Sequence, residues 1–120
     1  MANKRHLKSF IREMCGTLAV EIVMAREAFP EIERKRVHDI LVKIARLQSF
    51  TLRCASIGFE HTPADYSSRQ EYNKARSAYY RNAYKKLIEK FYVDYSDIVK
   101  EMNSALPETV REQIKAIIAQ

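Results

Sequence analysis

The sequence contains very little glycine and proline, with two Gly and three Pro among 120 residues. All-β proteins depend on these residues for their frequent tight turns, so the scarcity argues against an all-β fold. The two glycines, Gly16 and Gly58, are isolated, and the chain therefore has no glycine-rich loop of the kind that cradles a phosphate. The rest of the sequence is rich in Ala, Glu, Lys, Arg, Leu and Ile, which lose least on entering a helix.

Cysteine is also scarce, since only Cys15 and Cys54 are present. If the chain turns back near Pro30, the two cysteines lie roughly 15 and 24 residues from that turn, an offset of about 13 Å along antiparallel helices. A disulfide requires Cα atoms within about 7 Å of each other. We therefore expect two reduced, packed thiols in a cytoplasmic protein.

Long apolar runs are missing as well. No stretch approaches the roughly 18 uninterrupted apolar residues of a membrane-spanning helix. The basic residues between positions 4 and 12 imitate the start of a signal peptide, but Glu13 and Glu21 interrupt the apolar stretch that follows them. No convincing cleavage site is present either. We therefore expect a soluble protein without a signal peptide or a membrane span.

Apolar residues instead recur in alternating steps of three and four, which is the spacing of one face of an α-helix. The pattern predicts a first helix from the N-cap Asn3 to position 29. Pro30 interrupts this helix and is expected in the first turn of a second helix, which Gly58 ends. Ser68 and Glu71 form a predicted capping box that begins a third helix of about thirty residues.

A short amphipathic segment after Pro107 predicts a fourth helix, in which four apolar residues share one face: Val110, Ile114, Ile117 and Ile118. With 47% apolar residues, the chain is long enough to bury a continuous core as one domain over residues 1–120. We therefore predict an all-α fold, an antiparallel up-down helical bundle of three long helices plus a short C-terminal fourth. The residues in the middle of each stripe are expected to be nearly buried: Leu18, Ile22, Ile44, Leu47, Leu87, Phe91 and Ile98.

Several segments also carry a family resemblance. The chain opens with Asn3-Lys4-Arg5, Leu7-Lys8, Ile11, Cys15-Gly16, Leu18 and Glu21, and further matching segments are 44–48, 85–91 and 96–103. Through these segments the chain resembles, over about half of its length, a family of small uncharacterised helical proteins from Bacteroides and related gut bacteria. The resemblance implies a helical fold, and because the family has no assigned activity it implies no functional residues. The Tyr-rich segment before Lys85 and the extension after Asn103 depart from the family pattern, so length and partners are expected to differ.

No pattern in the chain indicates a metal site or a catalytic constellation. A di-metal centre in a helical bundle needs Glu-x-x-His on inward faces, and the sequence has no such pair. The three histidines, His6, His38 and His61, fall in separate segments, so we expect no shared zinc site. Cys15 has no histidine near it in sequence, and a packed free thiol is the commoner state of such a residue. We therefore expect no enzyme activity, no cofactor and no metal.

Charge is distributed unevenly along the chain. Lys and Arg total 21, against 15 Asp and Glu. Residues 69–90 contain seven basic and two acidic residues, whereas residues 94–120 contain three basic and five acidic residues. The third predicted helix therefore begins in a strongly basic segment and ends in an acidic one.

The candidate interaction surface combines cations with tyrosines: Arg69, Tyr72, Arg76, Tyr79, Arg81 and Lys85 on the third predicted helix, with Arg34 and Arg36 near the start of the second. Interleaved in this way, aromatic rings stack on bases while cations neutralise phosphates. The same pattern also fits a structural role, in which Tyr80 and Tyr84 face the core, the other tyrosines cover its rim and the cations are solvated. The sequence leaves both interpretations open.

The sequence supports two hypotheses for function. The first is a non-enzymatic helical module that acts through protein association, as a homo-oligomer or adaptor, because its apolar stripes are broader than a single helix contact requires. The alternative is a nucleic-acid-binding protein that uses the basic, Tyr-interleaved face of the third helix. One contiguous basic patch on the structure would favour the alternative. Neither hypothesis identifies the partner or the biological process.

Overall fold

The computed structural model of the protein describes residues 3–119, and of Ile114 it describes the backbone alone. It contains four α-helices: α1 (Lys4–Ala28), α2 (Arg34–Ala55), α3 (Arg69–Ala105) and α4 (Glu108–Ala119). A short 3-10 turn, η1 (Pro63–Asp65), lies between α2 and α3. No strand is present within residues 3–119. The predicted all-α class and the four helices are therefore confirmed.

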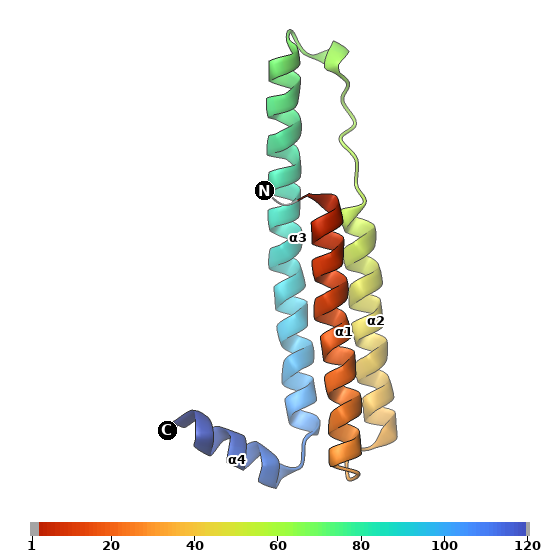
Figure 1. The fold of residues 1–120 in the computed structure, drawn as a ribbon, viewed down its shortest axis with the longest axis vertical. Helices are drawn as coiled ribbons and strands as arrows, with labels where there is room; N and C mark the ends of the chain where they lie inside the picture. Colours follow the sequence, from red (N-terminus) through yellow and green to blue (C-terminus); the bar gives the residue numbers. More distant parts are fainter. Residues whose placement is uncertain (1–2, 120) are drawn as a thin grey trace.

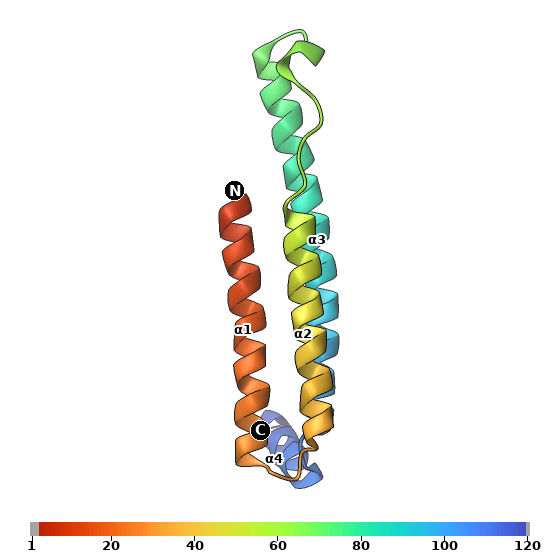
Figure 2. The same cartoon turned by 90° about the vertical axis from the view of Figure 1, so that its right-hand side faces the viewer.

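The three long helices lie alongside one another and alternate in direction (Figures 1 and 2). Helix α3 continues well past the start of α1, and α4 turns away from the other helices at the opposite end of the molecule (Figure 1). The principal extents are 65 × 33 × 17 Å, and the radius of gyration of the Cα atoms is 19.7 Å. A compact chain of this length would have a radius of gyration of about 14 Å. The molecule is therefore elongated.

The core is formed by apolar stripes on α1, α2 and α3. Its buried apolar residues are Leu7, Ile11, Cys15, Leu18, Ile22, Ile32, Val37, Ile40, Ile44, Leu47, Ala55, Tyr84, Phe91 and Ile98. The predicted core is correct except at Leu87, which is only partly buried. The buried residues of α3, Tyr84, Phe91 and Ile98, are seven positions apart and therefore lie along one line of the helix surface. Leu87 lies to one side of that line. With only two neighbouring helices in the same chain, a residue displaced from that line keeps part of its surface in solvent.

The turn between α1 and α2 differs from the prediction. Pro30 does not enter α2, which begins only at Arg34, with Glu33 in extended conformation at the N-cap. The amide of Ile32 instead donates a hydrogen bond of 3.0 Å to the carbonyl of Phe29, and the Ile32 side chain is buried with 3% of its surface exposed. Burial of the Ile32 side chain favours a turn at residues 30–33, where the sequence pattern predicted the first turn of the second helix.

The other predicted helix ends are partly correct. Asn3 caps α1, because its side chain accepts a 2.8 Å hydrogen bond from the amide of His6. Ser68 likewise caps α3, accepting a 3.1 Å hydrogen bond from the amide of Glu71, although the Glu71 carboxylate binds the Ser67 hydroxyl. Helix α3 has 37 residues and is longer than predicted. Gly58 does not end α2, which stops at Ala55, and no glycine among the described residues has a positive φ.

We expect Leu47→Ala to lower the free energy of unfolding by about 2–5 kcal/mol, because Leu47 is 8% exposed and its truncation removes buried methyl groups and leaves a cavity. Leu52→Ala is the matched control, since Leu52 is on the same helix and only partly buried. Denaturant unfolding of both variants measures the difference. A loss at Leu47 no larger than the loss at Leu52 would contradict the assignment of the core.

Candidate functional site

The residues of the candidate interaction surface do not form one surface. Arg69 and Tyr72 lie in the first turn of α3, whereas Arg76, Tyr79, Arg81 and Lys85 follow one to four turns later on the same helix. Arg34 and Arg36 lie in the first turn of α2, at the end of the molecule opposite to the start of α3 (Figure 1). The structure thus separates the α2 cations from the α3 cations by most of the length of the protein.

The α2 cations have contacts of their own. The Arg36 guanidinium donates a 2.5 Å hydrogen bond to the hydroxyl of Ser104, which joins the start of α2 to the end of α3. Arg34 lines a small cavity of about 330 Å³ together with Arg26 and Glu27 of α1. The contact of Arg36 with Ser104 indicates a structural role for Arg36 at the lower end of the molecule.

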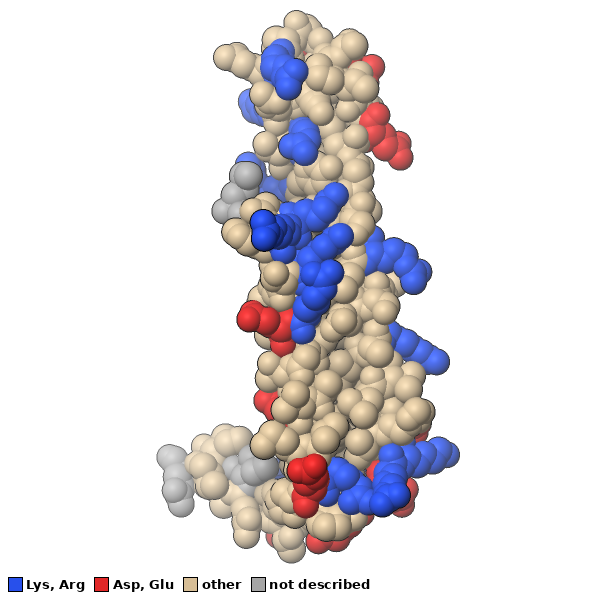
Figure 3. Space-filling model, turned by 45° about the vertical axis from the view of Figure 1, so that its right-hand side comes forward, with Lys and Arg blue, Asp and Glu red and all other residues tan. Residues whose placement is uncertain are grey.

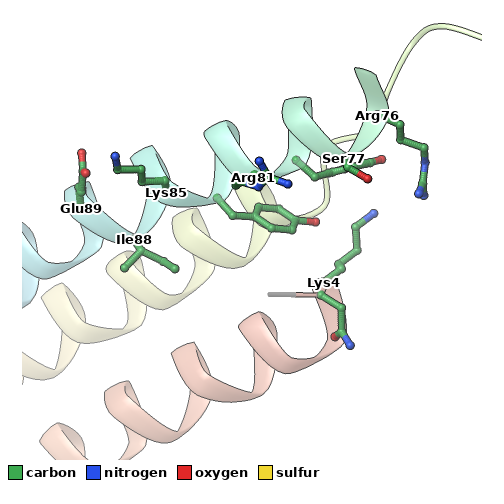
Figure 4. Close-up of a pocket in the computed structure, with 10 residues that line it drawn as sticks. Lys4, Arg76, Ser77, Arg81, Lys85, Ile88 and Glu89 are labelled. Carbon is green, nitrogen blue, oxygen red and sulfur yellow. The ribbon is translucent and has the colours of Figure 1, made fainter. Parts of the chain in front are cut away.

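Three of the α3 cations meet at a pocket. Arg76, Arg81 and Lys85 line a cavity of about 830 Å³ together with Lys4 of α1. In Figure 4 the Lys4 side chain extends from the start of α1 toward Arg76, whereas Lys85 and Glu89 lie farther along α3 and point away from α1. The remaining lining residues are Asn3, Ser77, Tyr80, Tyr84, Ile88 and Glu89. We call this cavity the α1–α3 pocket. It combines four cations, one carboxylate and a partly apolar wall.

The pocket lies at the start of α1, because α3 extends past this point while α1 does not. Farther along α3, Phe10 of α1 packs against Phe91 and Tyr92, with ring centroids 6.4 and 6.3 Å apart. Ile88 lies one helical turn before Tyr92 and therefore on the same face of α3. From the start of α1 toward the start of α3, no other helix of residues 3–119 lies along this face (Figures 1 and 2). The pocket is therefore the open continuation of the α1–α3 contact.

Aromatic side chains hold the connection between α2 and α3 against the first half of α3. The ring of Phe59 lies 5.8 Å from that of Tyr72 and 5.3 Å from that of Tyr79, and its amide donates a 3.0 Å hydrogen bond to the hydroxyl of Tyr80. Tyr66 packs edge-on against Tyr72 at 5.8 Å. We call these five residues the aromatic clamp. Tyr72 and Tyr79 thus contact the connecting segment, and Tyr79 still has 37% of its surface exposed.

The cations of the α1–α3 pocket are not neutralised by nearby carboxylates. Within residues 3–119, the ion pairs join Lys43 to Glu101, His61 to Asp65 and Lys90 to Asp94, and none involves a cation of the pocket. The Arg76 guanidinium lies over the ring of Tyr80, 5.0 Å from its centroid. Figure 3 shows Lys and Arg side chains gathered near the middle of one face of the molecule.

The sequence alone does not connect Lys4 with this site, although Tyr80 and Tyr84 belong to the tyrosines that alternate with its cations and fit either a base-stacking or a structural role. No spacing rule relates Lys4 to cations that follow more than seventy positions later, because their meeting depends on where two helices start. Tyr84 is buried and was assigned to the core under the structural interpretation. Its hydroxyl lies 3.5 Å from the carbonyl of Ala55, and burial is the main cause that raises the pKa of Tyr84.

The remaining reactive side chains are dispersed. His6 and His38 are exposed on α1 and α2, and His61 lies 3.7 Å from the Asp65 carboxylate. A hydrogen bond from the Thr62 amide is the main cause that lowers the pKa of Asp65. No group of three His, Cys, Asp or Glu within the described part of the chain is placed to hold a metal ion.

Both cysteines are free thiols. Cys15 is buried on α1 with 1% of its surface exposed, and burial raises its pKa. A nucleophilic cysteine requires the opposite shift, because the thiolate is the reactive form. The environment of Cys15 is therefore that of a packed core residue.

Comparison with family models, curated proteins and solved structures finds no match. The resemblance to the gut-bacterial family therefore stays a prediction. Among residues 3–119, no helix combines the length and the apolar character that crossing a membrane requires.

We expect the free energy of unfolding to fall as the pH rises above 9, the ordinary pKa of the Cys15 thiol. Burial raises this pKa in the folded state, so the unfolded chain loses its proton first and is stabilised by doing so. Denaturant unfolding at pH 8 and at pH 10 measures the change, with Cys15→Ala as the control that lacks this contribution. An equal pH dependence in both proteins would contradict the assignment.

Proposed function

We propose that the protein is a non-enzymatic helical module that acts in the cytoplasm through association with a second copy of itself. The observation that supports this proposal is the exposure of α4. None of its described side chains is buried, and Ile117 and Ile118 expose 70% and 78% of their surface. The two free thiols support the cytoplasmic assignment.

Helix α4 needs a partner to be stable. It has 12 residues, and isolated helices of this length are marginal in water because nucleation is costly. Helices in proteins gain most of their stability by burying an apolar face against a neighbour. In the monomer the apolar residues Ile117 and Ile118 have no such neighbour. A second protein surface that covers them would stabilise α4.

Further apolar side chains are exposed on the long helices. Val20 and Met24 on α1 are 58% and 62% exposed, and they lie one turn apart on the same face. Tyr92 and Val93 on α3 are 45% and 59% exposed. Soluble monomers seldom leave many large apolar side chains in solvent close together. These residues add exposed apolar surface on the long helices, which association with a second copy would cover.

The distribution of charge favours a second copy in the opposite direction. The first half of α3 is basic and residues 94–120 are acidic on balance. Two copies side by side in the same direction would place like charges together, whereas opposite directions bring each basic half near an acidic end. In this arrangement α1, α2 and α3 of each chain form an up-down bundle, and α4 of the partner copy supplies the fourth helix.

The second hypothesis, nucleic-acid binding, uses other residues. It depends on the cations of the α1–α3 pocket, which lies toward the other end of α3 from α4 (Figure 1). The two activities can therefore be separated by substitution.

We expect the mass in solution to rise with concentration from the 14.0 kDa of one chain toward twice that value. Ile117→Glu combined with Ile118→Glu should weaken association by about tenfold or more, because charge would enter the apolar contact. Sedimentation between low and high micromolar concentration measures the effect. Ala45→Glu with Ser49→Glu is the matched control, since it adds the same charge at exposed positions of α2.

Both variants must first unfold cooperatively, so that loss of the fold is not mistaken for loss of association. A wild-type protein that stays at the mass of one chain throughout the concentration range would refute self-association. If the α4 variant associates as tightly as the wild type while a dimer forms, α4 is not the contact.

A further inference from the structure

The α1–α3 pocket has the size and composition of a small-ligand site. Its volume of about 830 Å³ falls in the range of about 300–1,000 Å³ that is usual for such sites. Tyr80, Tyr84 and Ile88 line it in successive turns of α3, which gives it an apolar wall. Four cations and the hydroxyl of Ser77 supply polar groups at the same cavity. A ligand that fits this composition has an anionic group and a flat or apolar body.

The charge of the pocket selects an anion. Lys4, Arg76, Arg81 and Lys85 all line it, and Glu89 is the single carboxylate. Like charges held close together repel one another, and a bound anion relieves that repulsion. Arginine binds phosphate with two parallel N–H groups, whereas lysine acts as a point charge. Two arginines and two lysines therefore favour a phosphate-bearing ligand.

The position of Arg76 adds a planar surface. Its guanidinium lies 5.0 Å from the centroid of the Tyr80 ring, and the hydroxyl of Tyr80 accepts a hydrogen bond from the amide of Phe59. The ring is thus held by the aromatic clamp, and the guanidinium is held over the ring. Arginine planes and aromatic rings are the surfaces on which nucleobases stack. Figure 4 shows Arg76 at the end of the pocket nearest Lys4.

We propose that the α1–α3 pocket binds a phosphorylated nucleoside, either free or within a single-stranded nucleic acid. Its phosphate is bound by the cations that line the cavity, and its base lies against the Arg76 guanidinium and the Tyr80 ring. The pocket does not suit α4 of a second copy, because α4 carries two acidic and two basic residues and would leave the cations without neutralisation. The apolar contact proposed for self-association uses residues that do not line the pocket.

Fluorescence anisotropy with a labelled single-stranded RNA of twelve nucleotides is the first measurement, about the length that one small domain covers. Adenosine monophosphate, inorganic phosphate and polyglutamate serve as competitors. Binding should weaken steeply between low and physiological salt, since bound phosphates release counterions. If adenosine monophosphate displaces the RNA, a free nucleotide is sufficient for binding in the pocket. RNA binding that adenosine monophosphate does not displace identifies the nucleic acid as the ligand.

Substitution locates the site. Arg76→Glu with Arg81→Glu should weaken RNA binding by about tenfold or more, because each change replaces an attractive charge with a repulsive one. Lys35→Glu with Lys100→Glu is the matched control, because it makes the same change in net charge at exposed positions outside the pocket. The control should weaken binding by less than about threefold. Both variants and the wild type are compared at a concentration where sedimentation shows the mass of one chain, which keeps this test separate from that of self-association.

Four results would overturn the proposal. They are no binding of either the RNA or a labelled adenosine monophosphate even at low salt, equal losses in the two variants, polyglutamate competing as strongly as the nucleotide ligands, and inorganic phosphate competing as strongly as adenosine monophosphate. The second would indicate general attraction by a basic protein, the third a site for acidic polypeptides, and the fourth a site for anions without a base.

Discussion

Helix α3 is much longer than the helices beside it, and this difference in length determines most of what is unusual in the structure. Its 37 residues correspond to about 56 Å, whereas the 25 residues of α1 and the 22 of α2 correspond to about 38 and 33 Å. Two shorter helices cannot cover the whole of a longer one. The uncovered part of α3 is held by the aromatic clamp on one side and borders the α1–α3 pocket on the other.

The same difference divides the molecule into regions of unequal stability. From Tyr84 onward, α3 contributes buried residues to the core at every second turn, but none of its residues before Tyr84 is buried. Those earlier turns depend on ring contacts with Phe59 and Tyr66. Because local stability follows buried apolar contact, the first half of α3 and all of α4 are the segments most easily opened. They are also the segments to which we assign the two binding functions.

Hydrophobic spacing was sufficient to predict the class of the fold, the number of helices and most of the core, because steps of three and four are a local property of the chain. The starts of α1 and α3 were also predictable, since Asn3 and Ser68 act through amides in the adjacent turn. The start of α2 was not predictable in this way, because the burial of Ile32 depends on side chains that are distant in sequence. Only the α3 residues of the pocket could be predicted from the sequence. Its α3 cations stand out in the sequence, but Lys4 joins them through the relative lengths of two helices.

Amide hydrogen exchange followed by mass spectrometry, at a concentration where the protein is a monomer and without added nucleotide, tests most directly whether unequal helix length leaves part of α3 unsupported. The account predicts that amides in residues 69–83 exchange at least about tenfold faster than amides in residues 84–102, although both segments belong to one helix. Equal protection along the whole of α3 would contradict it, because the first half would then be as firmly held as the part that forms the core.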